Sequence, residues 1–243
     1  MRPDNMTIKT TFISFFILTY FLTFAQQRDT SNWRMYRYKV QDITYFLKLR
    51  PNDPEHYFNR GNYERELAMY KEALEDYTKS IELKPMPATY YNRGLTKYLL
   101  EKYQDAINDY TKAIEFLPSY DKAYDNMGLA YSKIGMYEEA MNSHNKAIEL
   151  NPEFSNAYFN RGELKGVNKK NDDALLDYNT AIKLNPKCTD CFINRGLLKA
   201  SKGNYLDAIA DFQSAIKIDA NYYSAYGNIG CAKFNLKKHE EAI

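Results

Sequence analysis

The chain has 243 residues, with 33 lysines and arginines against 31 aspartates and glutamates. This near-even balance argues against a nucleic-acid partner, because binding to a phosphate backbone normally requires a basic surface. The modest numbers of proline (8) and glycine (10), both regularly placed, argue against a disordered chain.

Residues 1–25 have the layout of a targeting segment. Basic residues precede the uncharged apolar run 11–25, and Thr23 and Ala25 stand where a cleavage site before Gln26 needs small residues. We expect a cleaved signal peptide and an exported chain, whether periplasmic, secreted or envelope-associated. The alternative is an uncleaved N-terminal membrane anchor, although a membrane span needs about 20 apolar residues.

Residues 26–53 are less regular than the rest of the chain. Their last part reads as the end of a helix, and Pro51 lies 34 residues before Pro85, which closes the first unit of the repeat described next. We interpret 26–53 as a degenerate half-unit whose helix caps the array, because the exposed ends of repeat arrays need caps.

From residue 54 onward, the chain repeats at intervals of 33 or 34 residues. An aromatic residue stands four positions before each recurring glycine, alanine follows twelve positions after it, and proline closes four of the units. Sixteen positions after the glycine stands an aromatic residue, or His144 in the third unit. The recurring glycines are Gly61, Gly94, Gly128, Gly162, Gly196 and Gly230.

This arrangement resembles the tetratricopeptide-repeat (TPR) family, whose unit has 34 residues and the same signature positions. The resemblance implies an all-α fold, a right-handed solenoid of antiparallel helix pairs that are stable only when stacked. We expect five full repeats and a partial sixth, at 54–86, 87–120, 121–154, 155–188, 189–222 and 223–243. Because Ile243 falls at the start of an expected helix, we also expect the natural chain to continue beyond it, with either more repeats or an effector domain.

Charged residues recur inside the units. Four full units carry arginine directly before the recurring glycine and aspartate sixteen residues after that arginine, whereas the third unit has Met127 and Ser143. We predict an ion pair between the two helices of each of these four repeats. The predicted pairs are Arg60–Asp76, Arg93–Asp109, Arg161–Asp177 and Arg195–Asp211.

The cysteines and histidines leave several interpretations open. Cys188 and Cys191 are either separate thiols, one in a loop and one packed near a helix start, or a disulfide across that helix start. A metal or redox site is a third interpretation, with no second ligand pair and no βαβ setting to support it. We expect Cys231 to lie in the core and His144 to be a packing residue.

No nucleophile elbow, phosphate-binding glycine loop or repeated carboxylate pair occurs in the sequence. We therefore predict that the protein is not an enzyme and that it uses no catalytic residue, metal or cofactor. One TPR subset binds C-terminal carboxylates through a clamp of lysine, asparagine and arginine. Phe58 stands where the resemblance would place the first lysine, and Asn126 where it would place the arginine, so such binding is not expected.

Asparagine stands two residues before every recurring glycine. In the TPR family, this offset faces the concave groove, and in some long arrays such a row resembles a ladder that binds a peptide backbone. The carboxamide suits that role because it can donate to a carbonyl and accept from an N–H. The row is Asn59, Asn92, Asn126, Asn160, Asn194 and Asn228. The alternative is that these asparagines only assist packing or solubility.

Apolar and aromatic neighbours of this row would select the side chains of a ligand. They are Phe58, Tyr91, Leu95, Tyr98, Leu129, Phe159, Ile193 and Leu197. We therefore predict a protein–protein interaction scaffold that holds a protein or peptide segment in its groove. The alternative is the N-terminal TPR part of a larger sensory, enzymatic or envelope-assembly protein. Membrane contact is expected only if the leader stays uncleaved, and the oligomeric state stays open.

Overall fold

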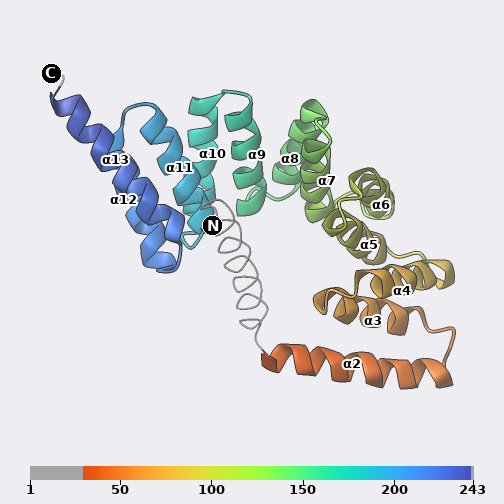
Figure 1. Cartoon of the computed structure of the whole chain (residues 1–243). Helices are drawn as coiled ribbons and strands as arrows, with labels where there is room; N and C mark the ends of the chain where they lie inside the picture. Colours follow the sequence, from red (N-terminus) through yellow and green to blue (C-terminus); the bar gives the residue numbers. More distant parts are fainter. Residues whose placement is uncertain (1–29, 242–243) are drawn as a thin grey trace, which may run out of the picture. The chain divides into compact units, whose positions relative to one another are not determined.

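A computed structural model describes residues 30–241 of the chain, in which all regular structure is helical (Figure 1). The predicted leader lies outside the described residues. Within 30–241, no helix is long and apolar enough to cross a membrane. The chain divides into two compact units, Met1–Pro85 and Met86–Ile243, and each is considered by itself.

The described part of the first unit contains three helices, α2 (Thr30–Leu49), α3 (Pro54–Glu66) and α4 (Tyr70–Leu83). Helices α3 and α4 form a pair, and α2 packs against α3. Between α2 and α3, the rings of Tyr36 and Tyr63 lie 5.7 Å apart. Arg60 also donates from Nη1 to the hydroxyl of Thr44 at 3.0 Å. The segment that we interpreted as a cap therefore contains a helix that covers the first pair.

The described part of the second unit contains four helix pairs followed by a single helix. Each pair packs against the next, and α13 packs against α12 and α11. The helices are α5 (Pro87–Leu99), α6 (Tyr103–Phe116), α7 (Asp121–Lys133), α8 (Tyr137–Leu150), α9 (Ser155–Val167), α10 (Asn171–Leu184), α11 (Thr189–Ser201), α12 (Tyr205–Ile218) and α13 (Tyr223–Glu241). The predicted all-α architecture of stacked helix pairs is confirmed.

A tight turn joins the two helices of each pair. One residue in every turn has a left-handed backbone, with φ of 58–83°. The next residue closes the turn by donating its N–H to the carbonyl five residues back, at 2.8–3.0 Å. The left-handed residues are Ala68, Glu101, Gly135, Lys169 and Gly203. Three of the five are not glycine, although this conformation favours glycine.

Close contact between a glycine and a ring holds the two helices of each pair together. A Cβ built on the recurring glycine of a first helix would lie 2.7–2.9 Å from a ring atom of the second helix in each of the five pairs. The ring belongs to Tyr178 opposite Gly162 and to His144 opposite Gly128. The packing role predicted for His144 is confirmed, because its side chain is fully buried.

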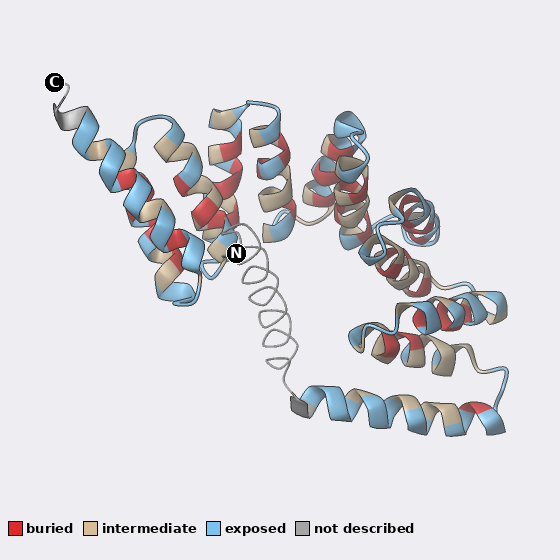
Figure 2. Cartoon of the chain, viewed as in Figure 1, coloured by how far each residue is buried: buried red, intermediate tan, exposed pale blue. Residues whose placement is uncertain are grey.

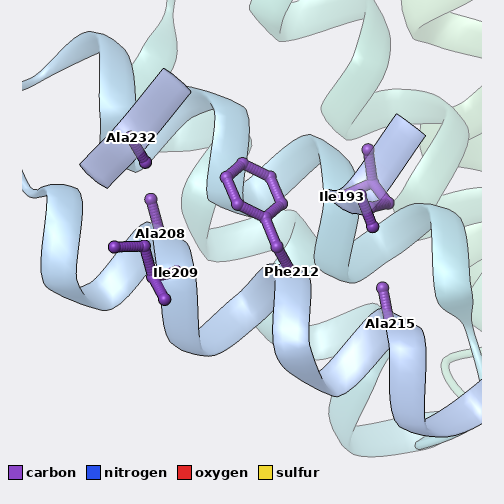
Figure 3. Close-up of a cluster of buried hydrophobic side chains, with 7 residues drawn as sticks. Ile193, Ala208, Ile209, Phe212, Ala215 and Ala232 are labelled. Carbon is purple, nitrogen blue, oxygen red and sulfur yellow. The ribbon is translucent and has the colours of Figure 1, made fainter. Parts of the chain in front are cut away.

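Alanine at the recurring positions lets neighbouring helices approach. Ala208 and Ala215 of α12 are fully buried, on either side of the ring of Phe212 (Figure 3). Figure 2 shows buried residues, in red, on the helix faces that meet within a pair. Since no pair covers both of its apolar faces alone, stacking supplies much of the stability.

The four predicted arginine–aspartate ion pairs are confirmed. In each, Nε and Nη2 of the arginine donate to both carboxylate oxygens of the aspartate, at 2.6–3.0 Å. The four aspartates are only 3–5% exposed. In three units, a lysine four residues after the arginine contacts the same carboxylate at 2.7–2.8 Å; these are Lys97, Lys165 and Lys199.

The first pair has Glu64 at the position of this lysine. Glu64 is 6% exposed, and its Oε1 lies 3.7 Å from Nε of Arg60. Burial, followed by the nearby charge of Asp76, raises the pKa of Glu64 from 4.5 to about 8. Two buried carboxyl groups here share one arginine, which is an arrangement that favours protonation of one of them.

Candidate functional site: the face of the first helices

The predicted asparagines lie on the first helix of each pair and on α13. In the second unit, the first helices contact one another in succession, α5 with α7, α7 with α9, α9 with α11 and α11 with α13. They carry Asn92, Asn126, Asn160, Asn194 and Asn228. We call the surface formed by this row the asparagine face. Asn59 and Phe58 lie on α3 of the other unit and are not part of it.

Three asparagines of this face form hydrogen bonds with the preceding first helix. Asn126 donates from Nδ2 to the hydroxyl of Tyr91 at 2.9 Å. Asn160 donates to both carboxylate oxygens of Asp125 at 3.2 and 3.0 Å, and Asn194 donates to Glu163 at 3.0 Å. The Nδ2 groups therefore link neighbouring repeats, as the packing alternative requires. A carboxamide also has an acceptor oxygen, and these bonds do not use it.

The predicted apolar neighbours differ in how far they reach solvent. Tyr91, Leu95, Tyr98, Leu129 and Phe159 are half-buried. They stand on the same helices as the asparagines, and Tyr91 contacts the row directly through its hydrogen bond with Asn126.

Leu197 is 45% exposed, whereas Ile193 is 6% exposed and lies in the core with Phe212 and Ala215. Ile193 is therefore the predicted neighbour least able to contact a ligand. In the first unit, Phe58 is half-buried and Asn59 is exposed.

A hollow of about 370 Å³ lies at the C-terminal end of the face, between α11, α12 and α13. Leu197 and Asn228 line it together with Tyr205 and Phe212. Cys231 also lines it and is exposed, so the prediction that Cys231 lies in the core was wrong. The reason is that α11, α12 and α13 leave this hollow open beside Cys231 instead of filling it with side chains.

Acidic groups on this face were missed by sequence reasoning. Asp125 is 3% exposed, accepts from Asn160, and lies 2.8 Å from Nδ1 of His144. Desolvation raises the pKa of the Glu163 carboxyl group above its ordinary value. The hydrogen bond from Asn194 offsets only part of this increase. Because these acids occupy different offsets within their repeats, no recurring position in the sequence marked them.

His144 has a further unusual feature. Its Nε2 is buried and has no hydrogen-bond partner among the described residues. The His144–Asp125 contact takes the place of the ion pair that the third unit lacks, because Met127 and Ser143 replace the arginine and aspartate. Within 30–241, no group of histidine, cysteine, aspartate or glutamate side chains is arranged to hold a metal ion.

Stacked helix pairs with a continuous row of first helices define a helical-repeat protein. Models of the tetratricopeptide repeat match residues 55–85, 87–120, 122–154 and 166–243. The chain belongs to the tetratricopeptide-repeat family. Members of this family act as protein–protein interaction scaffolds, bind proteins or peptides, and are typically not catalytic.

Solved structures of TPR proteins share this fold. YrrB, described as a TPR protein with an unusual peptide-binding site, is 24% identical, with 77% of this chain and 97% of that chain covered and a TM-score of 0.58. MamA is 25% identical, with 61% and 87% covered and a TM-score of 0.57. A thermophilic TPR protein of Thermus thermophilus is 18% identical, with 75% and 100% covered and a TM-score of 0.62. The comparison with curated proteins gave no match.

Proposed function

We propose that this protein is a scaffold that binds an extended segment of a partner protein along the asparagine face. One observation carries the proposal: successive first helices have asparagine at the same offset, and three of these side chains reach the preceding first helix. One carboxamide per repeat can meet an extended peptide at intervals along its backbone, because every peptide unit has one donor and one acceptor.

The internal hydrogen bonds refine which atoms would contact the ligand. Since Nδ2 of Asn126, Asn160 and Asn194 donates to the preceding helix, the carbonyl oxygens are the groups that would accept from ligand N–H groups. The internal bonds also fix the orientation of each carboxamide, which lowers the entropy lost when a ligand binds. The same bonds thus serve packing and prepare the face for binding.

The chemistry of the face favours a particular kind of ligand. Tyr91, Tyr98 and Phe159 offer apolar surface to aromatic or aliphatic side chains. Glu163, which is exposed, adds a carboxyl group near the centre of the row and would attract a lysine, an arginine or an N-terminal amine. We therefore propose a ligand with apolar side chains and at least one cationic group. The peptide-binding site described for YrrB, a protein of the same fold, supports a peptide as the ligand.

A peptide-display selection on the purified chain, followed by titration calorimetry of a selected peptide, tests this function. The double variant Asn126→Ala, Asn160→Ala removes two acceptor oxygens and should weaken binding by about 1 kcal/mol per lost hydrogen bond. Asn142→Ala is the matched control, because Asn142 is exposed on the second helix α8. Circular dichroism must show that the double variant keeps its helices.

Two outcomes would contradict the proposal. One is a selection that enriches no peptide over an unrelated helical protein. The other is a selected peptide that protects the asparagine face from hydrogen exchange but binds the double variant as tightly as the wild type. In the second case, the asparagines would serve packing alone.

A further inference from the structure

A disulfide between Cys188 and Cys191 lies at the start of α11. Of the interpretations left open by the sequence, the structure shows the bonded pair, with the two Cα atoms 5.3 Å apart. Cys188 is the residue that caps α11, and its Sγ accepts a hydrogen bond from the backbone N–H of Cys191 at 3.2 Å. The pair is therefore attached to the positive end of the helix dipole.

The two sulfur-bearing residues differ in their exposure to solvent. Cys191 is completely buried, whereas Cys188 is only partly buried. An external thiolate must reach a sulfur atom along the S–S axis to exchange with a disulfide. Cys188 is therefore the position at which such an attack can occur, and Cys191 is the leaving group.

This disulfide connects no separate parts of the fold. The two cysteines are three residues apart, and the chain-entropy stabilisation by a disulfide decreases as its loop becomes shorter. Other contacts already fix α11 in the array: the ion pair of Arg195 with Asp211 and the close approach of Gly196 to Phe212. This disulfide therefore adds little to the stability of the fold, and stabilisation does not explain why it is present.

The surroundings also suit the reduced form. A thiolate on Cys188 would keep the hydrogen bond from Cys191 and the favourable end of the α11 dipole. The nearest acidic residue in sequence, Asp190, already accepts a hydrogen bond from the hydroxyl of Tyr222 at 2.6 Å. That bond offsets part of the repulsion that its carboxylate would exert on a thiolate.

We propose that Cys188 and Cys191 form a thiol–disulfide exchange site that reacts with a dithiol of another protein. A partner thiolate attacks Sγ of Cys188, which breaks the Cys188–Cys191 bond and releases Cys191 as a thiolate that takes up a proton. The second partner thiolate then attacks the partner sulfur of the mixed disulfide and releases Cys188. Two electrons and two protons pass to the cysteine pair, and the partner becomes a disulfide; the reverse reaction oxidises the partner.

Glutathione is a suitable probe because it exchanges through the same mixed-disulfide step. Cys231 is an exposed free thiol, so the experiment uses a full-length Cys231→Ser background in which only the pair remains. The native protein is equilibrated with glutathione buffers of different redox ratio, quenched with acid, alkylated and analysed by mass spectrometry. We expect the reduced fraction to follow the buffer ratio without denaturant, while circular dichroism stays constant.

Single-cysteine variants in the same background test the roles of the two residues. Cys191→Ser should accumulate a glutathione adduct on Cys188, whereas Cys188→Ser should leave the buried Cys191 unmodified until the protein unfolds. A pair that stays oxidised in every buffer until denaturant is added would overturn the proposal, as would equal adduct formation on both cysteines. If either variant fails to fold, the titration of the background protein still decides the matter.

Discussion

The buried carboxyl group of Glu64 makes the stability of the first unit depend on pH. Glu64 lies where three other repeats have lysine, and it shares Arg60 with Asp76. The change that isolates its effect is Glu64→Gln, because glutamine has nearly the same shape and cannot ionise. We expect this variant to be more stable than the wild type at neutral pH and nearly equal to it in acid.

The magnitude follows from the pKa of Glu64, which rises from 4.5 to about 8 on folding. Between these values, the folded protein keeps a proton that the unfolded chain has released, so the unfolding free energy decreases as pH rises through this window. Each pH unit within it costs about 1.4 kcal/mol, and the cost at pH 7 is therefore about 3 kcal/mol. Below pH 4.5, both states are protonated and the cost disappears.

The assay is urea unfolding followed by the fluorescence of Trp33. Trp33 is the single tryptophan of the chain and lies on α2, which packs against α3, the helix of Glu64. The wild-type midpoint should fall between about pH 5 and pH 8, and Glu64→Gln should lose most of that fall. Glu82→Gln is the control, because the Glu82 side chain is 59% exposed on α4. An unchanged pH dependence in Glu64→Gln would refute the reasoning.

Three further predictions concern the turns, the helix contacts and the leader. In urea unfolding, Gly162→Ala should destabilise the protein by about 1 kcal/mol, because overpacking against the Tyr178 ring exceeds the gain in helix propensity. Gly230→Ala should be neutral or stabilising, because nothing lies within 4 Å of its added Cβ. Both Lys169 and Gly135 have positive φ, which favours glycine. In the same assay, Lys169→Gly should therefore raise the unfolding free energy by up to ~1 kcal/mol, and Gly135→Ala should lower it by a similar amount. A less stable Lys169→Gly variant or a more stable Gly135→Ala variant would contradict this. Mass spectrometry of the protein from its own host should find a chain that begins near Gln26 outside the cytoplasm; an intact leader on cytosolic protein would disprove export.

Features that recur at a constant offset from unit to unit were predictable from the sequence. A constant offset of sixteen residues places an arginine of the first helix opposite an aspartate of the second, so the pairs such as Arg161–Asp177 could be predicted before the structure was known. The recurring glycine and the ring sixteen residues later obey the same rule, as Gly162 and Tyr178 show. The helix pairs and the family followed from this spacing, because each repeat meets its neighbours in the same way.

Contacts that occur in one unit only were decided by the tertiary structure. Asn160 meets Asp125, and Asn194 meets Glu163, which stand at different offsets, so no periodicity could assign these partners. Cys231 was expected in the core because its repeat position is usually small, but burial depends on which helix packs on α13.

The disulfide likewise needed Cys188 and Cys191 to be placed around a helix start. Contacts that recur at the same offset in several repeats can be predicted from the sequence spacing. Contacts found in one repeat only, the burial of particular side chains and the resulting pKa shifts depend on which neighbours the stacking of helices brings together.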